Sequence, residues 1–467
     1  MKVVVLGLDC CTPQLLFDKW RDLLPNIKHL MENGIWGEIN STIPAITVPA
    51  WMSMMTSKTP GELGFYGFRN RKNYSYDEMF FATSASVKVD TTWDILSRLQ
   101  KKVIVVGVPP TYPVKPVNGC LLSCFLTPNT DSNFAYPADL KSEILNKFGD
   151  YIFDVVKFRT DDKDWLIEQI YKLAKNRFEI FEYLLKEKAW DFAMMVEMGV
   201  DRIHHGLWQY FDKEHPKYQP GSKYEHVIRD YYIYVDTKIG KILDLLDEET
   251  AVIIVSDHGA KRMEGGICFN DWLIQQGYLR LKAKPTQPTP FTNELVDWGK
   301  SRAWGSGGYY GRLFMNVRGR EPNGVIDPKD YEKERDELIA KISTITDPNG
   351  KNIGCKAYKP EEIYPEVKGI APDLIVYFGD LYWRSVGTVG NPTIWTFEND
   401  TGPDDANHAQ QGVFILAEPG ANKSIQAQNL DIIDVAPTVL DLMGLPVLAD
   451  MRGQSVYQKL NLVPKSH

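Results

Sequence analysis

Residues 252–255, Val-Ile-Ile-Val, are a run of β-branched side chains that leads into Ser256, Asp257, His258 and Gly259. Such a run predicts a strand buried on both faces, as found inside a parallel sheet. Because ligands bind at the carboxyl ends of strands in open α/β sheets, Asp257 and His258 are expected where ligands bind. A carboxylate oxygen beside an imidazole nitrogen suits zinc or manganese. The alternative is a strand followed by a surface turn, with the imidazole in solvent.

The same pattern occurs at two other places in the chain. Residues 2–8 predict a buried strand that ends at Asp9, and residues 191–197 predict a strand that is followed by Asp201 and His205. If a helical turn begins there, Asp201 and His205 are four residues apart and share one face of the helix. A surface ion pair is the ordinary alternative for this pair. Three strands that bring carboxylates to one sheet edge together predict a metal site.

Helical and strand patterns alternate along the first half of the chain. Amphipathic helices are expected over residues 15–33 (with a possible break at Pro25), 92–99, 164–188 and 224–247, and further strands over 38–43, 102–108 and 412–417. This rhythm predicts an α/β fold in which a mostly parallel sheet is sandwiched between helices.

The pattern changes between Ala260 and about Thr401, where glycine, proline and tyrosine become frequent. Helical periodicity is confined there to 328–343, and short apolar strands are expected at 313–317 and 373–377. We interpret residues 261–401 as an inserted cap subdomain over a catalytic core of 1–260 and 402–467. Because specificity usually resides in loops carried on a rigid sheet, we expect the insertion to set substrate class and to supply no metal ligand.

Thr47 stands at the expected start of another helix, with Pro49 in its first turn. We therefore predict Thr47 as the N-cap residue, because proline is tolerated in the first turn and threonine is a common cap. The field at a helix N-terminus favours negative charge and binds phosphate. Most threonines at this position only cap the helix, so this feature by itself is a weak indication of function.

The composition limits the partners of the chain. A net charge of −8 argues against binding to a nucleic-acid duplex, whereas bound divalent cations would still allow a small phosphate-bearing or nucleotide substrate. No run approaches the roughly 18 apolar residues of a membrane span, and the apolar residues 1–8 are too few for a signal peptide. The six cysteines lack paired zinc-finger spacing and are expected to be buried thiols. We expect a cytoplasmic protein.

These motifs together resemble the alkaline phosphatase superfamily and, within it, the type I phosphodiesterase/nucleotide pyrophosphatase branch. The resemblance covers most of the chain, and it depends on the order and spacing of six motifs: Gly7-Leu8-Asp9, Ile43-Pro44-x-x-Thr47-x-Pro49-x-Trp51, Asp201-x-x-x-His205, Ser256-Asp257-His258-Gly259, Asn407-His408 and Asp434-Val435-Ala436-Pro437-Thr438.

The resemblance implies the fold of that superfamily and a phosphoric ester hydrolase with two divalent metal ions, zinc or manganese. One ion would be held by Asp9, Thr47, Asp257 and His258. The other would be held by Asp201, His205 and His408. Thr47 would be the nucleophile and would form a covalent phosphothreonine-type intermediate.

Two other functions stay open at this point. A phosphomonoesterase or phosphomutase could use the same site, although many of those enzymes have a serine in place of Thr47. A catalytically silent metal-binding assembly protein would be expected if a ligand or the nucleophile were missing, and none is. A sulfatase is disfavoured, because Cys11-Thr12-Pro13 lacks the arginine of the sulfatase motif and lies in the wrong loop.

Six further residues are candidates for substrate contacts. Aromatic rings can stack on a nucleobase, and arginine or amide side chains can contact phosphate. A glycine- and tyrosine-rich segment more often simply packs, which is the alternative for the tyrosines. The candidates are Tyr66, Tyr309 and Tyr310 for stacking, and Arg69, Asn70 and Arg312 for phosphate.

Overall fold

In the computed structural model of the chain, which describes residues 1–464, a ten-stranded sheet forms the centre of the larger lobe. Its strands are Ile425–Gln426 (β22), Ile35–Asn40 (β2), Gln411–Ala417 (β21), Thr250–Val255 (β9), Lys2–Leu8 (β1), Phe192–Glu197 (β8), Val103–Val106 (β5), Gly119–Leu122 (β6) and Ala135–Tyr136 (β7), in this order, with Leu430–Asp431 (β23) beside β2. The five central strands, β9-β1-β8-β5-β6, run parallel, and β21 and β7 are antiparallel to their inner neighbours. The expected α/β fold with a largely parallel sheet is confirmed.

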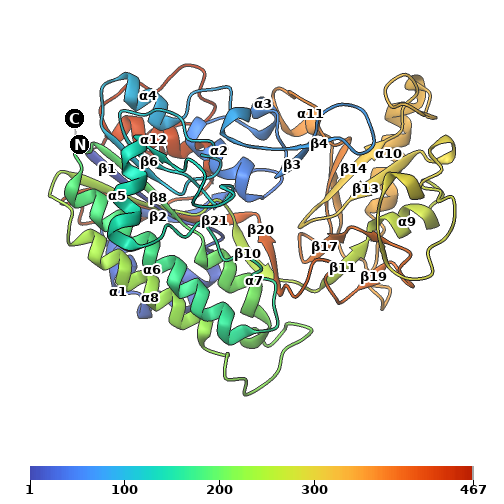
Figure 1. The fold of residues 1–467 in the computed structure, drawn as a ribbon, viewed down its shortest axis with the longest axis horizontal. Helices are drawn as coiled ribbons and strands as arrows, with labels where there is room; N and C mark the ends of the chain where they lie inside the picture. The colour runs from blue at the N-terminus through green and yellow to red at the C-terminus, as the bar shows by residue number, and fades with distance from the viewer. Residues whose placement is uncertain (465–467) are drawn as a thin grey trace.

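Helices cover both faces of this sheet (Figure 1). One layer contains Pro25–Glu32 (α1), Lys163–Glu187 (α6), Gly199–Phe211 (α7) and Val227–Leu243 (α8). The other contains Thr47–Thr56 (α2), Thr92–Arg98 (α4) and Val435–Leu442 (α12), while Ala138–Phe148 (α5) packs beside α6 and β7. The strands β1, β8 and β9 are buried along almost their whole length, because both of their faces lie under helices.

Two boundaries differ from those expected. The helix predicted over 15–33 is divided into a π-helical turn at Gln14–Lys19, a 3-10 turn at Arg21–Leu23 and α1, and α1 begins at Pro25. Proline has no N–H to donate within a helix but fits its first turn, so the chain restarts the helix there. The strand expected at 38–43 is β2, which begins three residues earlier because it pairs with β21 from Ile35 to Asn40.

Figure 1 shows a second lobe beside the larger one. This lobe has its own hydrophobic cluster. It contains an antiparallel sheet of Ala303–Ser306 (β13), Gly311–Met315 (β14), Leu374–Tyr377 (β16) and Lys356–Tyr358 (β15), a sheet of Trp383–Val386 (β17), Gly265–Cys268 (β11) and Trp395–Thr396 (β19), the short pair Thr289–Pro290 (β12) and Thr388–Val389 (β18), and the helices Phe269–Gln275 (α9), Tyr331–Ile342 (α10) and Pro360–Ile363 (α11). The chain leaves the larger lobe through Gly259–Arg262 (β10) and returns through Ala406–Ala409 (β20), and these two strands pair antiparallel.

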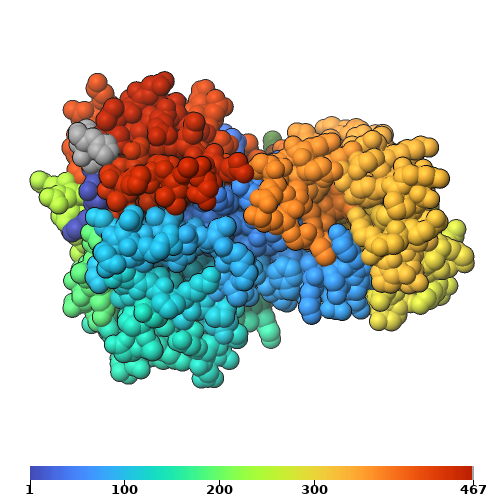
Figure 2. Space-filling model, turned by 90° about the horizontal axis from the view of Figure 1, so that it is seen from above, coloured from blue at the N-terminus to red at the C-terminus, as the bar shows by residue number. Residues whose placement is uncertain are grey.

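An early part of the chain also packs on the second lobe. The helix Pro60–Leu63 (α3) leads into a hairpin of Arg69–Arg71 (β3) and Met79–Phe81 (β4), and Figure 2 shows this blue segment against the orange and yellow lobe. The Tyr76 ring stacks on Trp298 with 3.6 Å between ring centroids, and Arg71 forms a buried ion pair with Glu321 at 3.0 Å. The second lobe is therefore completed by residues from outside 261–401.

None of the helices in residues 1–464 combines the length and hydropathy that a bilayer span requires.

Candidate metal centre

Three neighbouring strands deliver the acidic residues of the site to one sheet edge. Asp9 follows β1, Asp257 follows β9, and Asp201 lies in the first turn of α7, directly after β8. Because β9, β1 and β8 are adjacent and parallel, their carboxyl ends meet. All three carboxylates are at most 2% exposed. The parallel order of the strands thus brings together side chains that are 56 to 248 residues apart in the sequence.

Each of these carboxylates has one oxygen held by a donor of the protein. Trp51 Nε1 donates to Asp9 Oδ2 at 2.6 Å, and the backbone N–H of Cys10 donates to Asp257 Oδ1 at 3.1 Å. Arg202 Nη1 donates to Asp201 Oδ2. The other oxygens of Asp9 and Asp257 are buried and have no hydrogen-bond partner among the described residues. A buried carboxylate oxygen without a hydrogen-bond partner is costly, so these oxygens are suited to bind a cation.

The three histidines are held in a matching way. The Nδ1 atom of His408 lies 2.8 Å from the carbonyl oxygen of Ala45, and that of His258 lies 3.1 Å from the carbonyl oxygen of Gly259. His205 Nδ1 lies 2.7 Å from Asp404 Oδ1. In each case Nδ1–H is the donor, so Nε2 carries the lone pair that binds a metal.

The free atoms of these side chains face one another. His258 Nε2 lies 3.2 Å from Asp257 Oδ2 and 3.9 Å from Asp9 Oδ1. Asp201 Oδ1 lies 3.2 Å from His205 Nε2 and 3.9 Å from His408 Nε2. Three groups of ligand atoms lie within 4.8 Å of one another: Asp9/Asp257/His258, Asp201/His258/His408 and Cys10/Asp201/His205. The donor set of carboxylate oxygens and imidazole nitrogens fits divalent ions such as zinc or manganese.

Electrostatics point in the same direction. Burial and the neighbouring carboxylates raise the pKa of Asp9 and of Asp257 well above the usual range. Burial acts in the same sense on Asp201, but the charges of His205 and Arg202 outweigh it and lower its pKa well below the usual range. Three carboxylates this close need positive charge, and a bound cation reverses the local balance.

Thr47 faces this group from the start of α2. Its hydroxyl oxygen lies 3.3 Å from His258 Nε2, and the residue is 4% exposed. The prediction that Thr47 caps the helix is wrong, because Ile46 has the extended backbone of the N-cap and Thr47 is the first helical residue. Because its hydroxyl lies within hydrogen-bond distance of His258 Nε2, Thr47 faces the ligands from the first turn of the helix.

Several residues that support the site were not found from the sequence. Asp404 accepts hydrogen bonds from Arg159 Nε at 2.9 Å and from the Tyr309 hydroxyl at 3.1 Å, in addition to its contact with His205. Arg202 pairs with both oxygens of Asp154. Cys10 Sγ lies beside Asp201 and His205, and its thiol donates to the carbonyl oxygen of Gly259 at 3.4 Å. Arg159 and Asp154 lie in a loop without periodicity, and only the nearness of Asp404 to the Asn407-His408 motif offered a signal.

The metal centre opens into a cavity of about 410 Å³. Its wall includes Thr47, Asp201 and His408 from the centre, Arg69, Tyr309, Tyr310 and Arg312 from the expected substrate contacts, and Phe68, Phe125, Phe158, Arg159, Arg202 and Arg384.

The other two expected substrate contacts lie outside this wall. The Tyr66 hydroxyl donates to the carbonyl oxygen of Lys368 at 2.6 Å, and Asn70 bonds to the backbone of Tyr66 and Gly67. The Asn70 side chain therefore holds the local backbone, and the Tyr66 hydroxyl holds the distant backbone of Lys368.

Tyr309 comes from the insertion but touches the metal centre directly. Its ring stacks on His408 with 4.2 Å between centroids and on His205 with 4.8 Å. The insertion supplies no ligand atom to the three groups, but it does fix the orientation of two ligating imidazoles. One face of the Tyr309 ring is thereby occupied by the protein. Tyr310 donates its hydroxyl to the carbonyl oxygen of Tyr66, which ties the second lobe to the loop before β3.

Comparison with known proteins gives a consistent picture. Residues 3–404 match the family model of type I phosphodiesterase/nucleotide pyrophosphatase. No curated protein sequence matches the chain.

Among solved structures, the fold is similar to human ectonucleotide pyrophosphatase/phosphodiesterase 5, with 12% identity, 98% of each chain covered and a TM-score of 0.56. An inactive variant of the murine protein in complex with AMP is 13% identical over 98% of each chain, with a TM-score of 0.56. Phosphonoacetate hydrolase from Sinorhizobium meliloti 1021, in complex with phosphonoacetate, is 16% identical over 93% of this chain and 94% of its own, with a TM-score of 0.60.

Proposed function

Since the chain belongs to the type I phosphodiesterase/nucleotide pyrophosphatase family, we propose that Thr47 is the nucleophile of a two-metal phosphodiesterase or nucleotide pyrophosphatase. The family makes the protein a divalent-metal-dependent phosphoric ester hydrolase. The number of ions, their identity and the role of Thr47 are our proposal.

One observation carries this proposal. Six buried side chains each have one polar atom held by the protein and a second polar atom turned toward a common space beside the Thr47 hydroxyl. We assign one ion to Asp9, Thr47, Asp257 and His258, and the other to Asp201, His205 and His408. When bound, the ions supply the positive charge that lowers the pKa of a hydroxyl and polarises phosphoryl oxygens. Oxygen and imidazole ligands together favour zinc or manganese over magnesium.

The chain's own residues carry out the proposed displacement in two steps. Thr47 Oγ1 forms a bond to phosphorus as the bond to the leaving oxygen breaks, and this gives a phosphothreonine ester. The hydroxyl proton is lost and the leaving oxygen gains a proton. Water then cleaves the ester and restores Thr47. Two in-line displacements give net retention at phosphorus. The N-terminus of α2 adds a favourable field for the negative charge that develops.

The substrate class is also part of the proposal. The AMP complex of the murine relative and the arginine-lined cavity support a small nucleotide or phosphate ester as substrate. The six cysteines are all buried and unpaired, which supports our proposal of a reducing, cytoplasmic location.

A panel assay tests the proposed activity. Chelator-stripped protein is given Zn²⁺, Mn²⁺ or Mg²⁺ and assayed with bis-p-nitrophenyl phosphate and with p-nitrophenyl phosphate. We expect the diester to be cleaved faster, with Zn²⁺ or Mn²⁺, and elemental analysis to find about two ions per chain. A preference for the monoester would favour a phosphomonoesterase on the same site. If neither ester is cleaved with any of the three ions, the result would favour a catalytically silent metal-binding protein.

A further inference from the structure

Arg384, on β17, is a buried guanidinium whose hydrogen bonds are incomplete. The residue is 4% exposed, and its Nε and Nη1 atoms have no hydrogen-bond partner in residues 1–464. Its one ion pair joins Nη2 to Asp400 Oδ1 at 3.4 Å, and the other oxygen of Asp400 accepts the backbone N–H of Gly387. A buried charge with two free donors is costly unless a ligand completes it.

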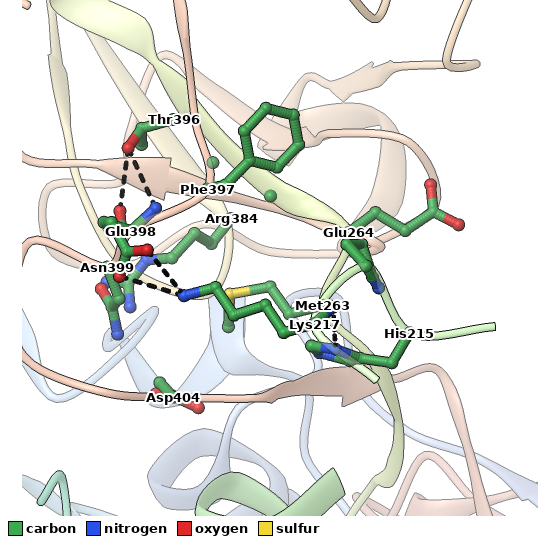
Figure 3. A pocket seen from close by; sticks show the side chains of 13 residues that line it. His215, Lys217, Met263, Glu264, Arg384, Thr396, Phe397, Glu398, Asn399 and Asp404 are labelled. Atoms are coloured by element: carbon green, nitrogen blue, oxygen red, sulfur yellow. Dashed lines mark hydrogen bonds and ion pairs between the residues drawn. The ribbon is translucent and has the colours of Figure 1, made fainter. Parts of the chain in front are cut away.

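The free donors belong to a residue that lines the space around the metal centre. Arg384 forms part of the wall of the cavity of about 410 Å³ at the metals and of a second cavity of about 360 Å³. It also lines a small pocket on its other side, where Figure 3 draws it among Glu264, Glu398 and Asp404. The two large cavities share Arg69, Gly307, Gly308, Arg312, Arg384 and Thr401. They are therefore two parts of one groove, and Arg384 stands where they meet.

Arg384 pairs with Asp400 through Nη2 alone, and two other arginines at this junction, Arg69 and Arg312, have no carboxylate partner among the described residues. Arg312 donates to the carbonyl oxygen of Arg69 and, at 2.8 Å, to Ser306 Oγ, while Arg69 lies over the Phe81 ring. Neither forms an ion pair with a carboxylate within the described part of the chain. The other arginines of the metal cavity are compensated, because Arg159 pairs with Asp404 and Arg202 with Asp154.

With the two divalent ions of the proposed function bound, the charge of the metal centre would be balanced without these arginines. Two divalent ions carry four positive charges and the carboxylates of Asp9, Asp201 and Asp257 carry three negative ones, which leaves one positive charge. A phosphodiester brings one negative charge and neutralises it. The positive charge at the junction is then left for a second negative group.

We propose that Arg384, with Arg312 beside it, binds a second anionic group of the substrate at the junction of the two cavities. The physiological substrate would then carry a phosphate or carboxylate in addition to the phosphoryl group that reacts, and the guanidinium fork of Arg384 would bind it through two N–H donors. Tyr76, Phe291 and Trp304 line the cavity beyond and offer apolar surface to the rest of such a molecule. The inference rests on the proposed function for the position of the reacting phosphoryl group.

Binding of matched ligands to the zinc-loaded protein tests the proposal without turnover. One pair is AMP and α,β-methylene-ADP, which differ by a second phosphate; the other is ethylphosphonate and 3-phosphonopropionate, which differ by a carboxylate. In titration calorimetry we expect α,β-methylene-ADP, 3-phosphonopropionate or both, which carry two anionic groups, to bind about 10- to 100-fold more tightly than the matched ligand with one anionic group. A preference in the first pair identifies the group as phosphate, and one in the second as carboxylate.

Variants assign that preference to named residues. Arg384→Gln should reduce the ratio of the two affinities to within about threefold of one, and Arg312→Gln should reduce it partly. Arg318→Gln removes an exposed arginine of the same lobe that pairs with Asp327 and lines neither large cavity, so the ratio should stay as in the wild type. Thermal unfolding confirms that each variant is folded, and Arg312→Gln keeps the test valid if Arg384→Gln does not fold.

The inference is wrong if the wild type shows no preference in either pair, or if folded Arg384→Gln and Arg312→Gln keep the full preference. Its failure differs from failure of the proposed function. A protein that prefers the doubly anionic ligands but cleaves no diester would retain the anion site and lack the activity. A protein that cleaves the diester without this preference would have the activity and lack the anion site.

Discussion

Replacing Asp404 with asparagine should weaken the binding of one metal ion and leave the binding of the other ion unchanged. The Asp404 carboxylate is fully buried and holds His205 Nδ1 at 2.7 Å, so it fixes the tautomer and the orientation in which Nε2 binds the metal. Loss of such a carboxylate beside a ligating histidine usually lowers metal affinity 10- to 100-fold, or by about 1.4 to 2.7 kcal/mol. Asparagine keeps one oxygen for the Nδ1–H but turns an amide group toward Arg159 or Tyr309. We therefore expect the upper part of this range.

Competition with a chromophoric zinc chelator measures both dissociation constants. The wild type should bind two ions, and in Asp404→Asn the ion held by Asp201, His205 and His408 should dissociate at 10- to 100-fold lower free chelator. The ion held by Asp9, Thr47, Asp257 and His258 should be unaffected. Glu398→Gln is the matched control, because Glu398 is an exposed acid from the same segment that pairs only with Lys217 in the described structure. If folded Asp404→Asn binds each of the two ions as tightly as the wild type does, the assignment of His205 as a metal ligand is refuted.

Four further predictions follow from the same structure. Thr47→Ala should lose several orders of magnitude in turnover of bis-p-nitrophenyl phosphate and keep at least one metal by elemental analysis, whereas Thr47→Ser should retain part of the activity; near-normal turnover of the alanine variant would exclude Thr47 as nucleophile. Trp51→Phe removes the donor to Asp9 Oδ2, so urea unfolding of the metal-free protein should show a loss of about 1–3 kcal/mol, and no loss would show that this hydrogen bond does not contribute. Chelation should lower the melting temperature, and added Zn²⁺ should raise it again with the logarithm of the free Zn²⁺ concentration, because the ions bind the folded state alone. A melting temperature independent of zinc would contradict the site. Burial lowers the pKa of His215 to about 4, so between about pH 6.5 and pH 4 this side chain is protonated in the unfolded chain and neutral in the folded chain. The free energy of unfolding should therefore fall as the pH drops through this range, by up to about 3 kcal/mol from this residue. His215→Gln should be less sensitive over that range, and an identical pH profile would show that His215 does not contribute.

Much of the fold could be predicted because its strands are short and buried on both faces. The runs at 2–8, 191–197 and 252–255 predict strands covered on both sides, and the helices predicted between them favour a parallel arrangement. Asp201 and His205 are four residues apart, so they share one face as soon as a single turn of helix forms between them. The local sequence decides whether that turn forms. The family motifs, Thr47 among them, are likewise properties of order and spacing.

The supporting contacts of the site could not be predicted in this way. Asp404 meets His205, Tyr309 stacks on His408, and Arg384 reaches the cavity only after the second lobe has folded against the larger one. Local periodicity carries no information about which distant side chains meet, because those contacts depend on how sheets and loops pack. For the same reason Tyr66 and Asn70 looked like substrate contacts in the sequence and in the structure hold backbone instead.

The sequence by itself determined the α/β sheet, the edge at which Asp9, Asp201 and Asp257 emerge, and the side chains available to bind metal. Tertiary structure alone decided which atom of each side chain is free. Trp51, Cys10, Arg202 and the partners of the histidine Nδ1 atoms each hold one polar atom of the six carboxylate and imidazole side chains, and the second polar atom can bind a cation. Tertiary structure also decided that Arg384 is buried with two donors unused. The physical reason is that residue type and spacing fix what a group can bind, whereas packing fixes which of its hydrogen bonds the protein has already made.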